Sequence, residues 1–259
     1  MHPFQRTELL LGTPAWNRLG GARMMVVGLG GVGSYAAEAL VRAGVGHLTL
    51  VDFDKVCLTN LNRQLHATRR TVGAAKVGIM AERCRTINPK ATIVAEQVFY
   101  EAGTSERLLA PGYDYVLDAI DNVTAKLHLL EACVVRSQPV IACMGAGGRT
   151  DPTRIRVTDL ARTNKDPLAK VIRKELRARG ITTGIEAVWT DEEPNALDAE
   201  VADAFHCICP GENDHHSCDK RNVVQGTVSW VPSMFGLMMA GTAVNRLLGR
   251  PVQSSDRPD

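Results

Sequence analysis

The sequence lacks the features that mark several large classes of protein. Its seven cysteines are an odd number without regular spacing, which argues against a disulfide framework and favours reduced thiols in a cytoplasmic protein. The formal charge is only +2, so overall electrostatics favours no class of partner. We find no internal repeat and no low-complexity tract. With 45% hydrophobic residues in 259, the chain is instead long and apolar enough to bury a sizeable core.

No segment has the composition of a signal peptide or of a clear membrane span. The opening residues, MHPFQRTELLLG, show no cleavage-site pattern, so we expect no signal peptide. Residues 222–245 carry no charge, but the run is interrupted by Gln225, Thr227, Ser229, Pro232, Ser233 and Thr242. Because a span needs about 20 mostly apolar residues, we expect a buried strand followed by a core or interface helix. Contact of this helix with a membrane is left open.

Apolar runs alternate with helical patterns through the first half of the chain. The runs predict strands within residues 22–30, 47–54, 91–99, 113–122 and 139–147. Helices are expected between them, at residues 34–45, 74–87 and 125–137. This alternation is typical of the α/β class: a Rossmann-like, doubly wound, mostly parallel sheet with helices on both faces. Ligands of such sheets bind at the carboxyl ends of the strands.

The pattern changes after Gly148. The stretch DPTRIRVTDL, residues 151–160, predicts a short strand. A helix is expected over residues 166–180, with Asp166 as its N-cap and Pro167 in its first turn. Residues 181–222 are expected to be irregular, so this part forms a C-terminal extension of the sheet.

A glycine motif follows the first strand. In VVGLGGVGSYAAEAL, Gly28, Gly30 and Gly33 have the spacing that lets backbone N–H groups approach an anion at a helix N-terminus. The motif is shared by dinucleotide sites and ATP sites. An acid after the second strand, Asp52 or Asp54, suits the ribose of either nucleotide. An NAD-dependent oxidoreductase is therefore one reading of these residues.

The residues that follow the acids favour ATP. Asn60, Arg63 and Lys76 bring polar and cationic side chains that suit a chain of three phosphates and a departing pyrophosphate. Asp121, after the fourth strand, is a candidate ligand for Mg²⁺, which prefers one or two carboxylates together with phosphate oxygens. Alternatively, the cations are solvated surface charges and Asp121 caps the next helix.

Two sets of motifs resemble known families. The succession RTELLLG, GLGGVGS, VDFDKVCLTNLNRQ, AAKV and DAIDN, over residues 6–148, resembles the ubiquitin-activating-enzyme-like adenylyltransferases. The segment GAGGRTDPTRIRVTDLARTNKDPLAKVIRKELRARGI is similar to one in bacterial tRNA threonylcarbamoyladenosine dehydratases. This resemblance implies a homodimer that uses ATP and Mg²⁺ to cyclise the threonylcarbamoyl group of an adenosine in tRNA. It also implies a single adenylyltransferase domain over residues 1–259, with an ATP-binding half at 1–148 and a substrate-binding part at 149–259.

The same resemblance implies a role for each motif residue. Gly28, Gly30, Gly31 and Gly33 surround the phosphates, and Asp54, with Asp52 beside it, meets the ribose. Asn60, Arg63 and Lys76 contact the phosphates, and Asp121 binds Mg²⁺. Arg6 reaches into the partner subunit's ATP site, so Arg6, Arg63 and Lys76 are the expected catalytic residues.

The cysteines depart from one branch of this superfamily. Many activators of sulfur-carrier proteins bind zinc through Cys-x-x-Cys pairs, and this sequence has none. It has instead a cluster of His206, Cys207, Cys209, His215, His216 and Cys218. The cluster is open to three interpretations: a metal site, a persulfide relay served by a cysteine desulfurase, or a loop with reduced thiols. An adenylyltransferase acting on the C-terminal glycine of a small sulfur-carrier protein therefore remains the alternative function.

The distribution of charge favours an RNA partner. Residues 149–179 hold ten Lys or Arg against four acids, whereas residues 186–203 hold seven acids and no base. A basic surface can attract and hold a phosphate backbone, although an ordinary solvated helix face has a similar composition. No set of aromatic residues is interleaved with these bases, so readout of a base sequence is not evident. A tRNA-binding protein or a sulfur-relay partner without catalytic activity is a further alternative.

Overall fold

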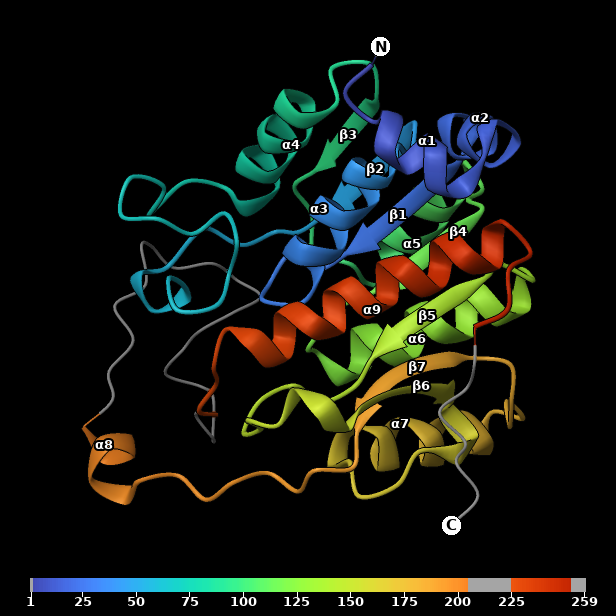
Figure 1. The fold of residues 1–259 in the computed structure, drawn as a ribbon. Coiled ribbons are helices and arrows are strands. Elements are labelled where there is room, and N and C mark those ends of the chain that lie inside the picture. Colours follow the sequence, from blue (N-terminus) through green and yellow to red (C-terminus); the bar gives the residue numbers. More distant parts are fainter. Residues whose placement is uncertain (1, 205–224, 253–259) are drawn as a thin grey trace.

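The strands form one continuous sheet. The computed structural model describes residues 2–204 and 225–252 (Figure 1). Within them, a seven-stranded sheet has the order β3-β2-β1-β4-β5-β7-β6. Neighbouring strands are parallel, except that β6 runs antiparallel to β7. The bounds are β1 Arg23–Val27, β2 His47–Val51, β3 Thr92–Glu96, β4 Tyr115–Asp118, β5 Val140–Cys143, β6 Ile155–Asp159 and β7 Glu186–Thr190. The predicted α/β, Rossmann-like, mostly parallel sheet is confirmed.

Helices cover both faces of this sheet (Figure 1). One face is covered by α3 Gly33–Ala43, α4 Lys76–Ile87 and α9 Trp230–Leu247, and the other by α5 Ala102–Leu109, α6 Val123–Val135 and α7 Pro167–Ala178. The helices α1 Gln5–Leu11 and α2 Thr13–Gly21 precede β1, and α8 Ala199–Asp203 follows β7. Short 3₁₀ turns complete the fold at η1 Leu58–Asn60, η2 Pro152–Arg154 and η3 Leu160–Arg162.

Each face of the sheet has its own apolar core. Along β1, Met24 and Val26 face the core under α3 and α9, whereas Met25 and Val27 face the core under α5, α6 and α7. All four side chains are at most 2% exposed. A strand buried on both faces needs a continuous apolar run instead of an alternating one. This requirement explains why the runs in the sequence located the strands.

The last helix returns to the first half of the chain. In α9, Phe235, Met239 and Ala243 are fully buried in the core that α3 also lines. The sheet is likewise continuous across residue 148, because β5 pairs with β7 in the register Ile141↔Glu186. Among the described residues, we find no helix that is both long and apolar enough to cross a membrane.

Two expectations for the second half are wrong. Residues 186–190 form β7 and residues 199–203 form α8, although the whole stretch 181–222 was expected to be irregular. The strand β7 has the sequence EAVWT, with only three apolar residues in a row, so it lacks the longer apolar run that located the other buried strands. No strand precedes α9 within the described residues 225–229, where Gly226 accepts a hydrogen bond from Gly148 N (2.7 Å) instead of joining the sheet. The expected N-cap is confirmed, because Asp166 Oδ1 accepts a hydrogen bond from Ala169 N (2.9 Å).

Candidate active site

The glycine loop lies at the carboxyl end of β1. Gly28 has a φ of +88°, and a Cβ there would lie 2.6 Å from the carbonyl oxygen of Ala119 in the turn after β4. At Gly33, the first residue of α3, a Cβ would lie 1.8 Å from the carbonyl oxygen of Gly28. Side chains are therefore excluded at both positions. The N-terminus of α3 is a site where the helix dipole and backbone N–H groups favour a phosphate.

The two acids after β2 have different surroundings. Asp52 is buried and accepts hydrogen bonds from Leu29 N (2.6 Å) and Asp54 N (2.8 Å), so it ties the end of β2 to the glycine loop. Burial raises the pKa of Asp52. Asp54 is half-buried, and its Oδ2 lies 2.8 Å from Nζ of Lys76. The structure thus brings both predicted acids to the same edge of the sheet.

Lys76 is a buried cation among carboxylates. It is the first residue of α4 and is 6% exposed. Burial alone lowers the pKa of Lys76, but Asp52, Asp54 and Asp121 outweigh it, so the net pKa is raised. The ammonium group therefore stays charged at neutral pH, as a group that neutralises phosphate oxygens must.

The segment that carries Asn60 and Arg63 packs beside the glycine loop. The buried Asn60 closes η1 by accepting a hydrogen bond from Cys57 N (3.0 Å). Cγ of Arg63 lies 3.3 Å from the position that a Cβ on Gly31 would take. The backbone N–H of Leu65 donates to Oγ of Ser34 in α3 (3.3 Å). These contacts place the predicted phosphate-binding side chains next to the loop.

The last two predicted residues lie at opposite ends of the sheet. Asp121 is exposed on the turn between β4 and α6, and its charge raises the pKa of both Lys76 and Lys126. It therefore lies in the same electrostatic neighbourhood as Lys76. Arg6 is exposed on α1. This helix lies near the amino end of β1, whereas the glycine loop of the same chain follows the carboxyl end of that strand (Figure 1). Within one subunit, the structure does not bring Arg6 to the other predicted residues.

Sequence reasoning missed an ion pair beneath this site. Nζ of Lys126, on α6, donates to Oδ2 of Asp118, the last residue of β4, at 2.6 Å. Neither side chain is exposed to solvent. One signal was present in the sequence: Lys126 stands between Ala125 and Leu127 in a helix that is apolar almost all round. A lysine in such surroundings requires a buried partner.

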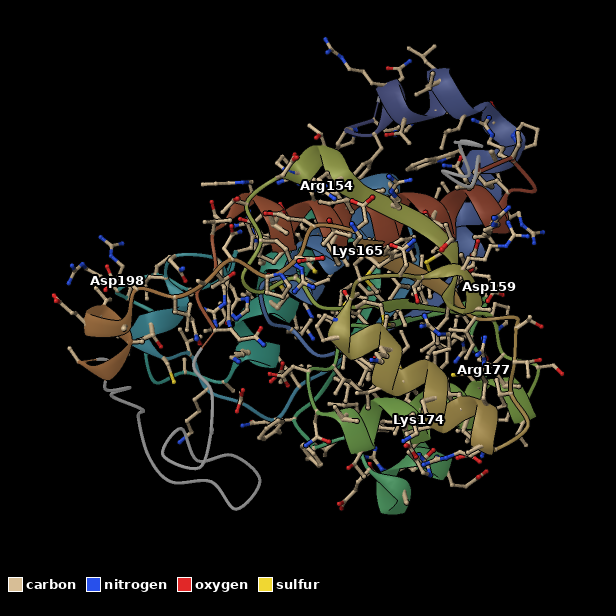
Figure 2. All side chains as sticks on the ribbon, turned by 90° about the horizontal axis from the view of Figure 1, so that it is seen from below. Arg154, Asp159, Lys165, Lys174, Arg177 and Asp198 are labelled. Atoms are coloured by element: carbon tan, nitrogen blue, oxygen red, sulfur yellow. The ribbon has the colours of Figure 1, made fainter. Side chains whose placement is uncertain are left out.

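The basic segment 149–179 divides into buried and exposed cations. Arg149 is buried, and Arg154 and Arg156 pair with Asp191 at 2.7 Å, within the segment that was expected to be a separate acidic stretch. On α7, three exposed cations share one face: Lys170, Lys174 and Arg177. Figure 2 shows Lys174 and Arg177 along this helix, with Lys165 in the loop that precedes it. A basic surface therefore exists, but it is narrower than the composition suggested.

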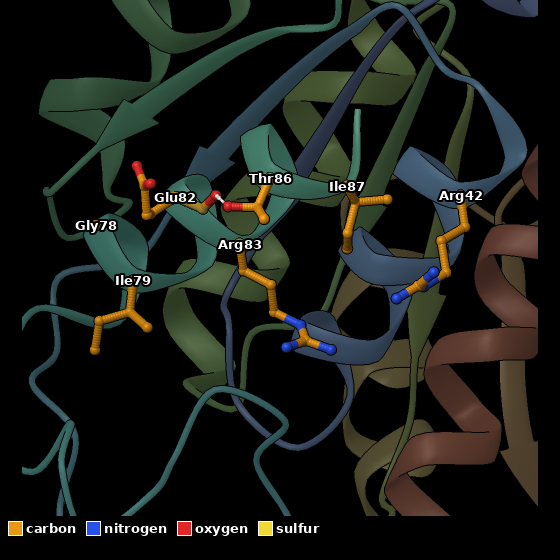
Figure 3. Close-up of a pocket in the computed structure, with 7 residues that line it drawn as sticks. All are labelled: Arg42, Gly78, Ile79, Glu82, Arg83, Thr86 and Ile87. Carbon is orange, nitrogen blue, oxygen red and sulfur yellow. Dashed lines mark hydrogen bonds between the residues drawn. The ribbon is translucent and has the colours of Figure 1, made fainter. Parts of the chain in front are cut away.

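A groove of about 560 Å³ lies between α3 and α4. Figure 3 shows the residues that line it, which are Arg42, Gly78, Ile79, Glu82, Arg83, Thr86 and Ile87. Both arginines are held by Glu38, with Nε of each 2.7 Å from a carboxylate oxygen. The groove runs along α4 from Gly78 to Ile87, and none of the residues that line it belongs to the glycine loop or to the acids at the carboxyl edge of the sheet.

Comparison with known proteins assigns the chain to a protein family. The ThiF family matches residues 4–258. The chain belongs to the ThiF family. It is 42% identical over 248 residues to the tRNA threonylcarbamoyladenosine dehydratase of Bacillus subtilis, covering 96% of this chain and 95% of that protein. To the enzyme of the same name from Escherichia coli it is 47% identical, covering 95% and 94% of the two chains.

A solved structure agrees with this assignment to the ThiF family. The crystal structure of E. coli tRNA N6-threonylcarbamoyladenosine dehydratase, TcdA, in complex with ATP matches with a TM-score of 0.81. The match covers 95% of this chain and 93% of that chain, at 36% identity. The predicted membership of the adenylyltransferase superfamily is confirmed.

The His and Cys cluster at residues 206–218 lies outside the described residues, so a sulfur-relay partner stays a prediction. In the part of the chain that the structure describes, no group of three or more His, Cys, Asp or Glu side chains is arranged to hold a metal ion. A magnesium site at Asp121 would therefore draw its other ligands from phosphate oxygens and water.

Proposed function

We propose that this ThiF-family protein uses ATP to cyclise threonylcarbamoyladenosine in tRNA, with loss of one water, through an acyl-adenylate. The observation that carries the proposal is the carboxyl edge of the sheet, where a phosphate-binding loop meets a buried lysine and acids. The chain with this arrangement matches the dehydratases of B. subtilis and E. coli over 95% and 94% of their length. The protein is thus an enzyme that adenylates the carboxylate of its substrate and thereby modifies tRNA.

The chemistry follows from the poor reactivity of a carboxylate. An oxygen of the substrate's threonyl carboxylate attacks the α-phosphorus of ATP, and the bond to pyrophosphate breaks. The neighbouring carbamoyl oxygen then attacks the activated carbonyl carbon, the ring closes, a proton is lost from the carbamoyl nitrogen, and AMP departs. Ring closure is intramolecular, so positioning of the substrate supplies much of the rate. No nucleophile from the protein is needed.

Different residues of the site contribute to different parts of this reaction. The Gly28–Gly33 loop holds the phosphates, and Asp54, with Asp52 beside it, holds the ribose. Lys76, Arg63 and Asn60 offset and orient the negative charge that moves onto the departing pyrophosphate. Asp121 would hold Mg²⁺, which supplies further neutralisation of phosphate charge when bound.

We further propose a homodimer in which Arg6 completes the partner's site. Arg6 is exposed and remote from the glycine loop of its own chain, so it can act only across an interface. Leu9 and Leu10 of the same helix are 78% and 80% exposed, and Trp230 and Leu237 of α9 are 48% and 45% exposed. Apolar side chains as exposed as these favour burial against a second copy.

The exposed cations of α7 are the proposed contact with tRNA. Lys170, Lys174 and Arg177 lie one helical turn apart on a single face, and the exposed Lys165 is in the loop that precedes the helix. Cations spaced in this way suit successive phosphates and carry no information about base sequence. Recognition of the modified adenosine then depends on the active site and not on α7.

The test is incubation with ATP and tRNA that carries threonylcarbamoyladenosine, followed by mass analysis of the nucleosides. We expect the modified nucleoside to lose the mass of one water, with AMP and pyrophosphate formed in equal amounts. Amidation of the substrate carboxylate should abolish all three products. Formation of AMP and pyrophosphate that requires a small carrier protein with a C-terminal glycine, and ignores the modified tRNA, would replace this proposal by the sulfur-carrier alternative.

A further inference from the structure

A second glycine-rich turn lies next to the nucleotide edge of the sheet. Residues 145–148 follow β5, whose register with β4 pairs Ala142 with Asp118. The turn therefore runs beside the β4–α6 turn that carries Asp121. The 145–148 turn and the proposed magnesium ligand are thus close neighbours.

Arg149 and Asp166 hold the backbone of this turn through hydrogen bonds. Arg149 is only 3% exposed, and its Nη1 donates to the carbonyl oxygen of Gly147 (2.7 Å). Its Nη2 lies 3.6 Å from Oδ2 of Asp166. The same Oδ2 accepts a hydrogen bond from Gly145 N (3.0 Å). A buried ion pair that contacts both ends of a turn fixes the turn's backbone, as a preformed binding site requires.

The turn offers donors that the described part of the protein does not use. Gly145 N donates to Asp166 and Gly148 N donates to Gly226 O (2.7 Å). Between them, neither Ala146 N nor Gly147 N donates to an acceptor in the described residues. Nη2 of Arg149 is likewise buried without a hydrogen-bond acceptor there. Consecutive unpaired N–H groups above a buried cation form a cradle for a small anion.

We propose that the Gly145–Gly148 turn binds the carboxylate of the substrate's amino-acid arm, with Arg149 as the positioning residue. The proposal rests on the proposed function, because that reaction needs a carboxylate beside the α-phosphorus of ATP. The glycine loop of residues 28–33 serves the nucleotide on one side of β4, and the 145–148 turn lies on the other side, next to β5. The N–H groups of Ala146 and Gly147 orient the attacking oxygen, and Arg149 keeps them in place.

The experiment measures binding of two tRNAs in the presence of a non-hydrolysable ATP analogue. One carries threonylcarbamoyladenosine, and the other carries the same group with its carboxylate converted to a carboxamide. We expect the wild type to prefer the carboxylate by about tenfold or more, as for the loss of a charge-assisted hydrogen bond. Arg149→Met and Gly147→Ala should reduce this preference to about threefold or less, while Arg149→Lys should keep part of it. Affinity for the ATP analogue alone should stay unchanged.

Matched variants separate this role from a structural one. Arg107→Met removes an exposed arginine of α5. Gly103→Ala adds a methyl group to the same helix at an ordinary contact distance (3.9 Å) from Oε1 of Glu101, so both variants should keep the full preference. At Gly147 the added Cβ would meet Oε1 of Gln225, the end of a flexible side chain, so Gly147→Ala should still fold. Equal weakening of both tRNAs by the Arg149 and Gly147 variants would overturn the proposal. Failure of the proposed function is recognised separately, since the wild type would then not convert the modified tRNA at all.

Discussion

Lys126 and Asp118 form an ion pair that is fully removed from solvent, with Nζ 2.6 Å from Oδ2. The second oxygen of Asp118 accepts a hydrogen bond from Ile120 N (3.0 Å), inside the turn that leads to Asp121. The pair therefore links the end of β4, the start of α6 and the turn between them. A buried charge that loses its partner is strongly destabilising.

Removal of the lysine should destabilise the fold. Lys126→Met leaves the carboxylate of Asp118 buried and unpaired, so we expect the free energy of unfolding to fall by about 3–5 kcal/mol. Urea denaturation measures this loss. Addition of Asp118→Asn to the same chain should recover part of it, because the buried charge is then gone. A double variant as unstable as Lys126→Met would show that the unpaired charge is not the cause.

Asp121→Asn tests the proposed magnesium ligand. The change is nearly isosteric and lies on an exposed turn, so the melting temperature should stay within a few degrees of wild type. Pyrophosphate release should fall by about a hundredfold or more, because removal of one electrostatic contact at a reacting centre has effects of that size. Glu106→Gln, at an exposed position on α5, is the control and should leave the rate of pyrophosphate release unchanged. Turnover by Asp121→Asn at the wild-type rate would show that Asp121 has no part in the reaction.

Mixing of two inactive variants tests action across a dimer. Arg6→Ala and Lys76→Ala should each lack activity alone, since every site then misses one residue. After subunit exchange, a hybrid dimer has one site with both residues intact. We expect recovery to approach a quarter of wild-type activity when random exchange gives about half hybrids, each with one of its two sites complete. Confirmed exchange without any recovery would place Arg6 outside the active site.

Charge reversal on α7 tests the tRNA surface. Lys170, Lys174 and Arg177 changed together to Glu should weaken tRNA binding and flatten its dependence on salt. Each lost phosphate contact lowers the log–log slope by roughly 0.7 to 0.9. Reversal of Arg85, Lys90 and Arg107, near β3 at the far edge of the sheet, is the charge-matched control. Equal flattening by both triple variants would mean that only net charge matters and that α7 has no special role.

His66 should make stability depend on pH. It is 3% exposed, and neither ring nitrogen has a hydrogen-bond partner in the described residues. Burial, aided by the charges of Lys76 and Arg83, lowers its pKa from 6.5 to about 4. The unfolded chain therefore binds the proton first, so stability is fully present above pH 6.5 and is lost as the pH falls toward 4, by roughly 3 kcal/mol at pH 4.

The control for that prediction is a second histidine. His66→Leu removes the titrating group without breaking a hydrogen bond, so its free energy of unfolding should fall less between pH 6.5 and pH 4 than that of the wild type. His47→Gln, at an exposed position on β2, should leave the wild-type profile unchanged. Unfolding in urea over this pH range provides the measurement. If the free energy of unfolding fell equally with pH in His66→Leu and in the wild type, His66 would not be the group responsible for the pH dependence.

Local pattern predicted the fold better than it predicted the partners of charged residues. The central strands were found because burial on both faces forces a continuous apolar run, as in β1. The short strand β7 was missed because its role depends on pairing with β5 and β6. Likewise, Arg149 counted as part of a basic surface, yet it is buried against Asp166. Composition records how many charges a segment has, whereas exposure is decided by segments distant in the sequence.

The position of α9 sets a condition on the synthesis of this protein. The helix supplies Phe235, Met239 and Ala243 to the core over β1, β4 and α3, all of which leave the ribosome much earlier. Until residue 247 has emerged, a nascent chain therefore presents an uncovered apolar surface on that side of the sheet. The opposite face, closed by α5, α6 and α7, is complete once residue 190 has emerged. The core under α9 can therefore be completed only after the opposite core can, and a chaperone that binds apolar surface has its target in that interval.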